Sequence, residues 1–276
     1  MITENEKKEL HKILLEIMEY IHEVCCENNI QYFLAGGTLL GAIRHNGFIP
    51  WDYDVDIHMT RENYIKFENV LINKNDSRFK YCSYKNEKDY YKPHATVVKK
   101  HTLYYNFRDA INRELKCNYG IFVDIIPLDY AVDFNDAKAI KRKVHFFRRI
   151  VSLKKGFSSS QNECKLKKII RFIIRLSLSP LPLSFINMLL DKVMQSSNGK
   201  KCSLLLDSTS RYKVDKACWD KKLYETTQLH VFEGHHFLIP EGYHEILSII
   251  YGDYNVFPSK EVIDRESYFI YKISTK

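Results

Sequence analysis

The sequence lacks the patterns that mark secreted, membrane-spanning and repeat proteins. Its seven cysteines are scattered and form no C-x-x-C pair, so we expect neither a disulfide framework nor a zinc ribbon. No run of about 20 uncharged apolar residues occurs, which argues against a spanning helix. The first eight residues are polar and unlike a secretory signal, and no internal repeat is present. These absences favour a cytoplasmic protein with reduced thiols.

What the chain does contain is an ordinary globular composition, 45% hydrophobic and 28% charged, with an uneven distribution of charge. Residues 138–175 hold 13 basic residues and one acid, a net charge of +12, so the rest of the chain carries −4 of the total of +8. Apolar residues at helical spacing between these lysines and arginines predict a pair of basic amphipathic helices. Two interpretations stay open: an ordinary surface helix pair, or a face that contacts an anionic membrane. Nucleic acid is not expected as a partner, because no nucleic-acid-binding motif accompanies the charge.

Periodicity predicts an α+β protein in which helices flank a mixed sheet. Thr3 and Glu6 form a capping-box pattern, and the apolar spacing that follows predicts a helix over residues 4–27. Strands are expected at 30–35, 54–59, 81–84, 94–99, 102–106 and 121–126, the last one closed by Pro127, and helices at 39–44 and 61–71. From residue 137 the pattern is mostly helical, apart from a β-rich patch near 231–240. We therefore expect a catalytic core over 1–136 and a mostly helical region over 137–276.

A pair of glycines stands where a predicted strand meets a predicted helix. Gly36 and Gly37 allow backbone amides to approach a ligand closely, and Thr38 can cap the helix that follows. A helix N-terminus favours anions, so this turn is a candidate phosphate site. An ordinary strand-to-helix turn has the same pattern.

Three aspartates are candidates for metal binding. Asp54 and Asp56 are two residues apart in a predicted strand, so their side chains would share one face and repel. A divalent cation with oxygen ligands, such as Mg²⁺, would relieve that repulsion, although an exposed acidic edge is the plainer alternative. Asp124 lies inside a predicted buried strand, where a carboxylate must be paired with a cation or coordinate a metal.

These features together resemble the polymerase-β-like nucleotidyltransferase superfamily, and within it the LicD family, which includes the fukutin-related proteins. Three blocks carry the resemblance: LAGGTLLGAIRHNGFIPWDYDVDI at 34–57, FVDIIPLD at 122–129, and PEGY at 240–243 with YGDY at 251–254. They span most of the chain. The family often has a third acid where this chain has Tyr53. The resemblance implies a nucleotidyltransferase-like fold for the core.

The resemblance also implies Mg²⁺-dependent transfer of phosphocholine from CDP-choline to a hydroxyl of a bacterial surface glycan precursor, such as teichoic acid, lipopolysaccharide or capsule. Asp54, Asp56 and Asp124 would be the catalytic and metal-binding residues, with Mn²⁺ as an alternative ion. Asp124 would complete a second metal site or accept the proton of the sugar hydroxyl.

Other residues in the motif have expected roles toward the donor. Gly36, Gly37 and Thr38 would cradle phosphate oxygens, and Arg44 would neutralise their charge. Trp51 and Tyr53 are candidates for holding the quaternary ammonium of choline through cation–π contacts.

Two other functions fit the same residues. Phosphoglycerol, phosphoribitol or a nucleotide could be the transferred group, because the glycines and acids would bind the phosphates of the donor and not the alcohol attached to them. A non-catalytic adaptor for a membrane or glycan, acting through residues 138–175, is the alternative of a different class. The expected location is cytoplasmic, with peripheral contact at the inner face of the plasma membrane.

Overall fold

A seven-stranded mixed sheet organises the computed structural model, which describes residues 3–106, 120–156, 165–266 and 270–275. The α-helices are α1 (Glu4–Glu27), α2 (Gly36–His45), α3 (Arg61–Leu71), α5 (Phe134–Lys155), α6 (Lys165–Leu178), α7 (Leu183–Met194), α8 (Tyr243–Tyr251) and α9 (Lys260–Glu266). The strands are β1 (Phe33–Leu34), β2 (Asp56–Thr60), β3 (Phe79–Cys82), β4 (Ala95–Lys99), β5 (Thr102–Asn106), β6 (Phe122–Ala131), β7 (Leu204–Leu206), β8 (Cys218–Asp220), β9 (Thr227–Phe232), β10 (His235–Pro240) and β11 (Ile270–Thr275). The α+β class is confirmed.

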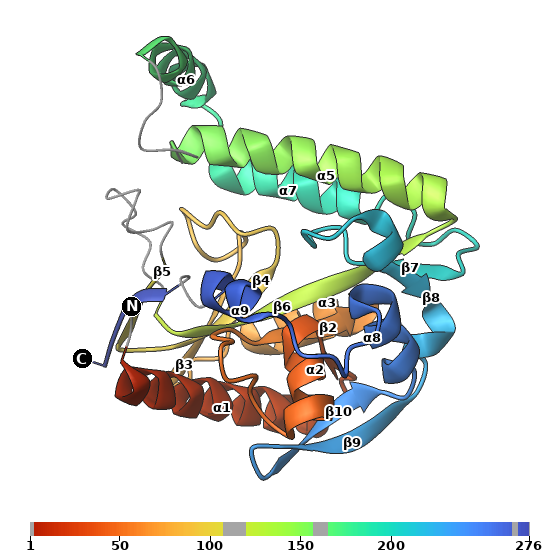
Figure 1. Cartoon of the computed structure of the whole chain (residues 1–276). Coiled ribbons are helices and arrows are strands. Elements are labelled where there is room, and N and C mark those ends of the chain that lie inside the picture. Colours follow the sequence, from red (N-terminus) through yellow and green to blue (C-terminus); the bar gives the residue numbers. More distant parts are fainter. Residues whose placement is uncertain (1–2, 107–119, 157–164, 267–269, 276) are drawn as a thin grey trace.

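The sheet has the order β1-β2-β6-β4-β3, and β7 and β8 extend it beyond β6. Only β2 and β6 run parallel among these pairs. In Figure 1, α1 lies below the sheet and the α5–α7 pair lies above it. The central strands β2 and β6 therefore lie between two helical layers.

Helix α1 forms as the sequence predicts. The Thr3 hydroxyl accepts a hydrogen bond from the Glu6 amide at 3.2 Å, and the Glu6 carboxylate accepts one from the Thr3 amide at 2.7 Å. Apolar residues at helical spacing, from Leu10 to Val24, are buried against the sheet in the main core. This layer fixes which face of each strand points into the core.

Strand β6 is longer than predicted, because it continues through Pro127 to Ala131. The Asp124 amide donates to the Val55 carbonyl at 3.0 Å, toward β2, so alternation directs the nitrogen of Pro127 to the other side. On that side, pairing with β4 has ended at Ile125. The missing N–H of proline therefore costs no ladder bond, and the strand is not interrupted.

The C-terminal half contributes strands as well as the predicted helices. β7 pairs with β6 over Asp129–Ala131, which the sequence did not predict, whereas β9 and β10 form a hairpin where a β-rich patch was expected near 231–240. The division of the chain near residue 136 stays a prediction.

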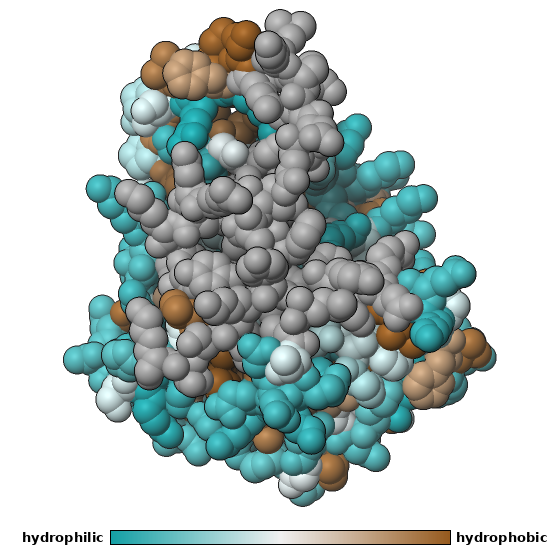
Figure 2. Space-filling model, turned by 60° about the vertical axis from the view of Figure 1, so that its left-hand side comes forward, coloured by the Kyte–Doolittle hydropathy of each residue, from teal (hydrophilic) through white to brown (hydrophobic). Residues whose placement is uncertain are grey.

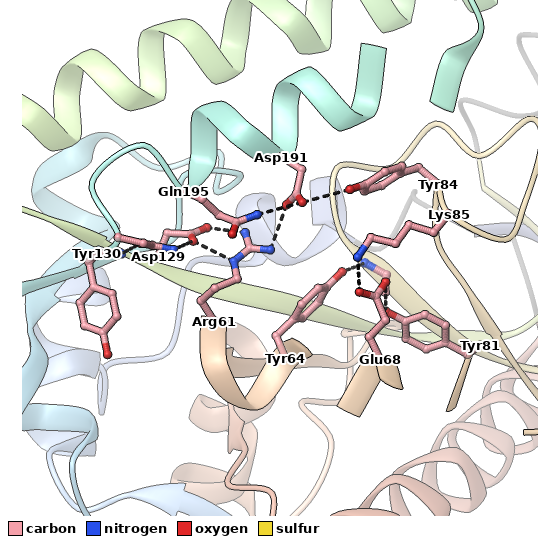
Figure 3. A network of polar contacts seen from close by, with 12 residues as sticks. Arg61, Tyr64, Glu68, Tyr81, Tyr84, Lys85, Asp129, Tyr130, Asp191 and Gln195 are labelled. Carbon is pink, nitrogen blue, oxygen red and sulfur yellow. Dashed lines mark hydrogen bonds and ion pairs between the residues drawn. The ribbon is translucent and has the colours of Figure 1, made fainter. Parts of the chain in front are cut away.

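A buried ion-pair network joins the two halves, shown in Figure 3. Arg61, on α3, donates to both carboxylate oxygens of Asp129 on β6, at 2.8 and 2.6 Å, and to Asp191 on α7 at 2.9 Å. Burial acts to lower the pKa of Arg61, but the charges of Asp129 and Asp191 outweigh it and raise that pKa. Asn198 and Gln195 donate further hydrogen bonds to the same two carboxylates. We call Arg61, Asp129 and Asp191 the arginine clamp.

Candidate active site

The parallel pairing of β2 with β6 places two of the predicted acids side by side. Asp56 is in register with Asp124. Their neighbours Val55, Ile57 and Ile125 are buried in the core that α1 covers. Because side chains alternate along a strand, Asp56 and Asp124 share the opposite face. The predicted meeting of strand carboxylates is therefore present. We call this surface the acid face.

Asp54 lies two residues before β2 begins, and its side chain is exposed. It is not part of the strand, in contrast to the predicted strand over 54–59. It is nevertheless close enough to act on Asp56. Burial raises the pKa of Asp56 well above its usual range, and the charges of Asp54, Asp124 and Asp52 raise it further. The acid face is thus a cluster of mutually repelling carboxylates.

The amino end of α2 borders the acid face. The helix begins at Gly36, earlier than predicted. Its N-cap residue is Ala35, which has no polar side chain to cap the first amides of the helix. Gly36 has a positive φ of 50°, and a Cβ built on Gly37 would lie 2.5 Å from Oδ2 of Asp52. The backbone at Gly36 therefore favours glycine, and a side chain at Gly37 would displace the Asp52 carboxylate. The amide end of a helix carries positive potential, so it favours negative charge at this place.

Thr38 has a different role from direct phosphate binding. Its hydroxyl oxygen accepts a hydrogen bond from the Asp56 amide at 3.0 Å, and its side chain is buried. Thr38 thereby fixes the start of β2 against the first turn of α2. A phosphate held by the glycine amides would face the carboxylates of Asp52 and Asp56, so the two negative groups need a cation between them.

Lys92 and His94 were missed by the sequence reasoning. The ammonium of Lys92 lies 2.7 Å from Oδ1 of Asp124 and 3.3 Å from the ring centroid of Phe122. Nε2 of His94 lies 3.2 Å from the same oxygen. Burial acts to raise the pKa of Asp124, but Lys92 and His94 outweigh it and lower that pKa to about 2. A signal existed: strand β4 pairs Thr96 with Asp124, so alternation places His94 on the same face.

Arg44 is not brought to the acid face. It stands in the last turn of α2, about 12 Å along the helix from Gly36. Its Nη1 donates to the Tyr254 carbonyl at 3.0 Å, and its guanidinium lies 4.7 Å from the ring centroid of Phe257. In this structure Arg44 therefore anchors the C-terminal segment.

The two aromatic candidates for choline binding, Trp51 and Tyr53, are both half-buried and both pack against the main core. Trp51 makes edge contacts with His45 and Phe257, at centroid distances of 6.2 and 6.3 Å. Their role toward choline stays a prediction.

Tyr251 and His58 extend the polar surroundings of the acids. Burial raises the pKa of Tyr251 well above its usual range, and the charges of Asp52 and Asp56 add to this effect, so its hydroxyl lies within electrostatic reach of them. His58 follows Asp56 by two residues on β2, and its Nε2 lies 3.7 Å from Oδ2 of Asp207. Sequence reasoning gave neither residue a role in the site.

The donor set of the acid face suits a hard divalent cation, although no group of three or more Cys, His, Asp and Glu residues within the described ranges is arranged as a finished metal site. Lys92 already neutralises Asp124. Among the described residues Asp56 has no such partner; burial raises its pKa, and the neighbouring negative charges, which a cation would offset, raise it further. Asp54 and Asp56 are thus the carboxylates with charge left for Mg²⁺.

Known proteins resemble this chain over two different stretches: one relative matches nearly the whole chain, and the family domain and other relatives match only a part of it. Residues 29–117 match the LicD/FKTN/FKRP nucleotidyltransferase domain. The lipopolysaccharide cholinephosphotransferase LicD of Haemophilus influenzae is 28% identical over 259 residues, which cover 92% of this chain and 93% of that protein. The ribitol 5-phosphate transferase FKRP of Homo sapiens is 44% identical over 52 residues, 19% of this chain and 10% of that protein. An uncharacterised protein of Rickettsia typhi is 46% identical over 67 residues, 24% of this chain and 21% of that protein.

Proposed function

Because this chain belongs to the LicD family, with its nucleotidyltransferase domain at residues 29–117, we propose that it transfers phosphocholine from CDP-choline to a hydroxyl of a bacterial surface glycan precursor. The similarity to a lipopolysaccharide cholinephosphotransferase over 92% of the chain supports both the transferred group and the kind of acceptor. Teichoic acid, lipopolysaccharide and capsule precursors are the acceptors to be compared. A cytoplasmic location is part of the proposal.

The observation that carries the proposal is the acid face at the amino end of α2. Phosphoryl transfer depends on positioning and charge neutralisation more than on covalent chemistry by the protein. Asp54 and Asp56 would hold Mg²⁺, with Mn²⁺ as a substitute, and Asp124 would contribute to a second ion. The bound ion would supply the positive charge that lets a diphosphate lie beside these carboxylates.

The chain's own residues bind and orient the donor in this proposal. The amides at Gly36 and Gly37 face the anionic group, and Thr38 holds Asp56 at its place through the 3.0 Å hydrogen bond. Lys92 is the nearest positive charge to Asp124 and would stabilise negative charge on the phosphate.

His94 is better suited than Asp124 to accept the proton of the acceptor hydroxyl. A carboxylate with a pKa of about 2 is a weak base near neutral pH. Both ring nitrogens of His94 are buried and make no hydrogen bond to the residues that the structure describes, and Nε2 lies at the ion-pair distance of 3.2 Å from Oδ1 of Asp124. Asp124 would then orient the imidazole, as a carboxylate does for a catalytic histidine elsewhere.

A second candidate is transfer of ribitol phosphate. The 44% identity to ribitol 5-phosphate transferase FKRP, over a short stretch, favours it. Phosphoglycerol and nucleotide donors belong in the same comparison, because the acid face contacts phosphates rather than the passenger group.

A donor panel tests the proposal. The purified chain is incubated with Mg²⁺, glycan precursors and CDP-choline, CDP-ribitol, CDP-glycerol or CTP, and the products are identified by mass. We expect CMP release with CDP-choline and a mass gain of phosphocholine on the acceptor, both lost in Asp54→Asn and with a chelator. Release of diphosphate, or turnover of CDP-ribitol alone, would overturn the choline assignment. Retention of a tenth or more of the rate in Asp54→Asn would overturn the metal assignment.

A further inference from the structure

Helix α6 exposes an apolar face to solvent. Five of its apolar side chains are between 48% and 67% exposed, namely Ile169, Ile170, Phe172, Ile173 and Leu176. Figure 2 shows hydrophobic side chains gathered at the top of the molecule, where Figure 1 places α6. A surface helix of a soluble protein normally turns such a face toward the core. A contiguous exposed patch of this kind marks an interaction site.

The contacts of α6 explain why this face stays outside. Lys154, at the end of α5, donates to the carbonyls of Leu178 and Ser179 at 2.8 and 3.1 Å, which caps the end of α6. The guanidinium of Arg175 lies against Gly156, the residue that ends α5. The side of α6 that meets α5 is thus polar and basic in part, and the apolar face points away. Helix α7 behaves in the opposite way, because its apolar residues Leu183, Ile186 and Leu190 are buried.

The charge around this face selects its partner. Helix α6 contains five basic residues and no acid. On the neighbouring α5, Lys138, Arg142 and Arg149 are exposed and repeat at helical spacing beside Phe146, which is 60% exposed. A second copy of this chain would bring a like charge of +12 in residues 138–175, so self-association through this surface is opposed. An anionic lipid surface is complementary in charge and accepts apolar side chains.

An interfacial helix also fits the dimensions better than a spanning one. Within the described residues no single helix is long and apolar enough to cross a membrane. The pair Ile169–Leu178 and Leu183–Met194 is together long and apolar enough, but it is bent by 88° and its second helix buries Leu183, Ile186 and Leu190 in the protein.

We propose that α6 lies in the headgroup layer of an anionic bilayer, with Phe172, Ile173 and their apolar neighbours inserted and the basic residues of α5 and α6 against lipid phosphates. Basic amphipathic helices bind membranes in this orientation. The inference does not rest on the transferase activity, since it uses the exposed face and its charge alone.

Vesicle flotation of the full chain tests this inference. We expect the protein to float with phosphatidylcholine vesicles that contain about 30% phosphatidylglycerol and to remain behind with phosphatidylcholine alone, a difference of at least about tenfold in bound fraction. Raising the salt from about 0.1 M to about 0.5 M should release most of it.

Matched variants separate the apolar face from general surface effects. Ile173→Asn removes a side chain that is 56% exposed on α6, and Leu229→Asn removes one that is 58% exposed on β9. Ile173→Asn should lower binding about tenfold, and Leu229→Asn should leave it unchanged. Both variants must keep the wild-type circular dichroism and donor turnover.

Three results would overturn the inference. They are absence of binding to the anionic vesicles, equal loss of binding in both variants, and concentration-dependent self-association that Ile173→Asn abolishes without any vesicle binding. A second readout does not depend on Ile173→Asn folding. Phe172→Trp should show quenching of its added fluorescence by brominated lipid, and unquenched fluorescence on bound protein would contradict insertion.

Discussion

The acid face and the arginine clamp both hold aspartates on the central strands, yet their charges are balanced in opposite ways. In the clamp, the fully buried Asp129 receives two hydrogen bonds from Arg61 and one from Asn198. Burial raises the pKa of both Asp129 and Asp56; the charge and hydrogen bonds of Arg61 oppose this rise at Asp129, whereas the charges of Asp54 and Asp124 add to it at Asp56. The clamp is complete within the chain, whereas the acid face needs a charge from outside. The comparison indicates that the clamp stabilises the fold and the acid face sacrifices stability for ligand binding.

The largest expected effect comes from removing a charge of the acid face. Asp56→Asn should lower turnover of the proposed donor by at least about 100-fold, because a carboxylate that holds a metal ion cannot be replaced by an amide. Steady-state rates of wild type and variant at saturating Mg²⁺ measure this loss. A variant with a rate within tenfold of wild type would place the chemistry elsewhere.

Breaking the arginine clamp should lower the stability of the fold. Arg61→Met leaves Asp129 and Asp191 buried without their cation, so we expect the free energy of unfolding to fall by about 3–5 kcal/mol. Urea denaturation checks this value, with Arg211→Met as a control, since Arg211 is exposed and its loss should cost less than about 0.5 kcal/mol. Similar losses in the two variants would mean that the clamp is no more than a surface contact.

Lys92 links the two types of site, because it balances one acid of the acid face. The pKa of Asp124 is about 2, below the unfolded value of about 3.9, so the pair contributes stability above pH 4 that is lost as the pH falls toward 2. Lys92→Met should raise the pKa of Asp124 and lower stability at pH 7 by about 1–2 kcal/mol. Carboxyl ¹³C titration in the presence of a chelator reports the pKa directly. An unchanged pKa would show that His94 alone accounts for the shift.

The smallest expected effect is a gain in stability, in contrast to the losses expected for the clamp and for Lys92. A raised pKa of Asp56 means that its ionised form destabilises the folded chain, so Asp56→Asn should raise stability at pH 7 in the absence of divalent ions. For the same reason, the stability difference between wild type and variant should shrink as the pH falls and Asp56 protonates. Thermal melts at pH 7 and pH 5 measure both. A destabilised variant would mean that Asp56, like Asp129, has a structural partner.

Local signals in the sequence predicted much of the fold and the centre of the site. The capping box and apolar spacing predicted α1 at its observed bounds, and the apolar run around Asp124 predicted a buried strand. The two-residue period of strands predicted a shared face only for Asp54 and Asp56, and Asp54 lies outside β2. The meeting of Asp56 with Asp124 was implied by the family resemblance. The helix and the strand depend on neighbours in the chain, which a pattern can read.

The rest depends on contacts between distant segments. Lys92 reaches Asp124 because β4 pairs with β6, and Arg61 finds Asp191 because α7 packs above the sheet. Arg44 illustrates the reverse: its motif position implied a phosphate contact, but 210 residues of chain separate it from the Tyr254 carbonyl that it binds. No local period encodes such pairings.

The central claim is that the acid face binds a divalent cation together with a diphosphate donor. Calorimetric titration of Mn²⁺ into wild type and Asp56→Asn, each with CDP-choline present, tests it most directly. The account predicts saturable binding to wild type and affinity at least about tenfold weaker in the variant. Equal affinity of the two proteins for Mn²⁺, or no heat with wild type, would contradict it.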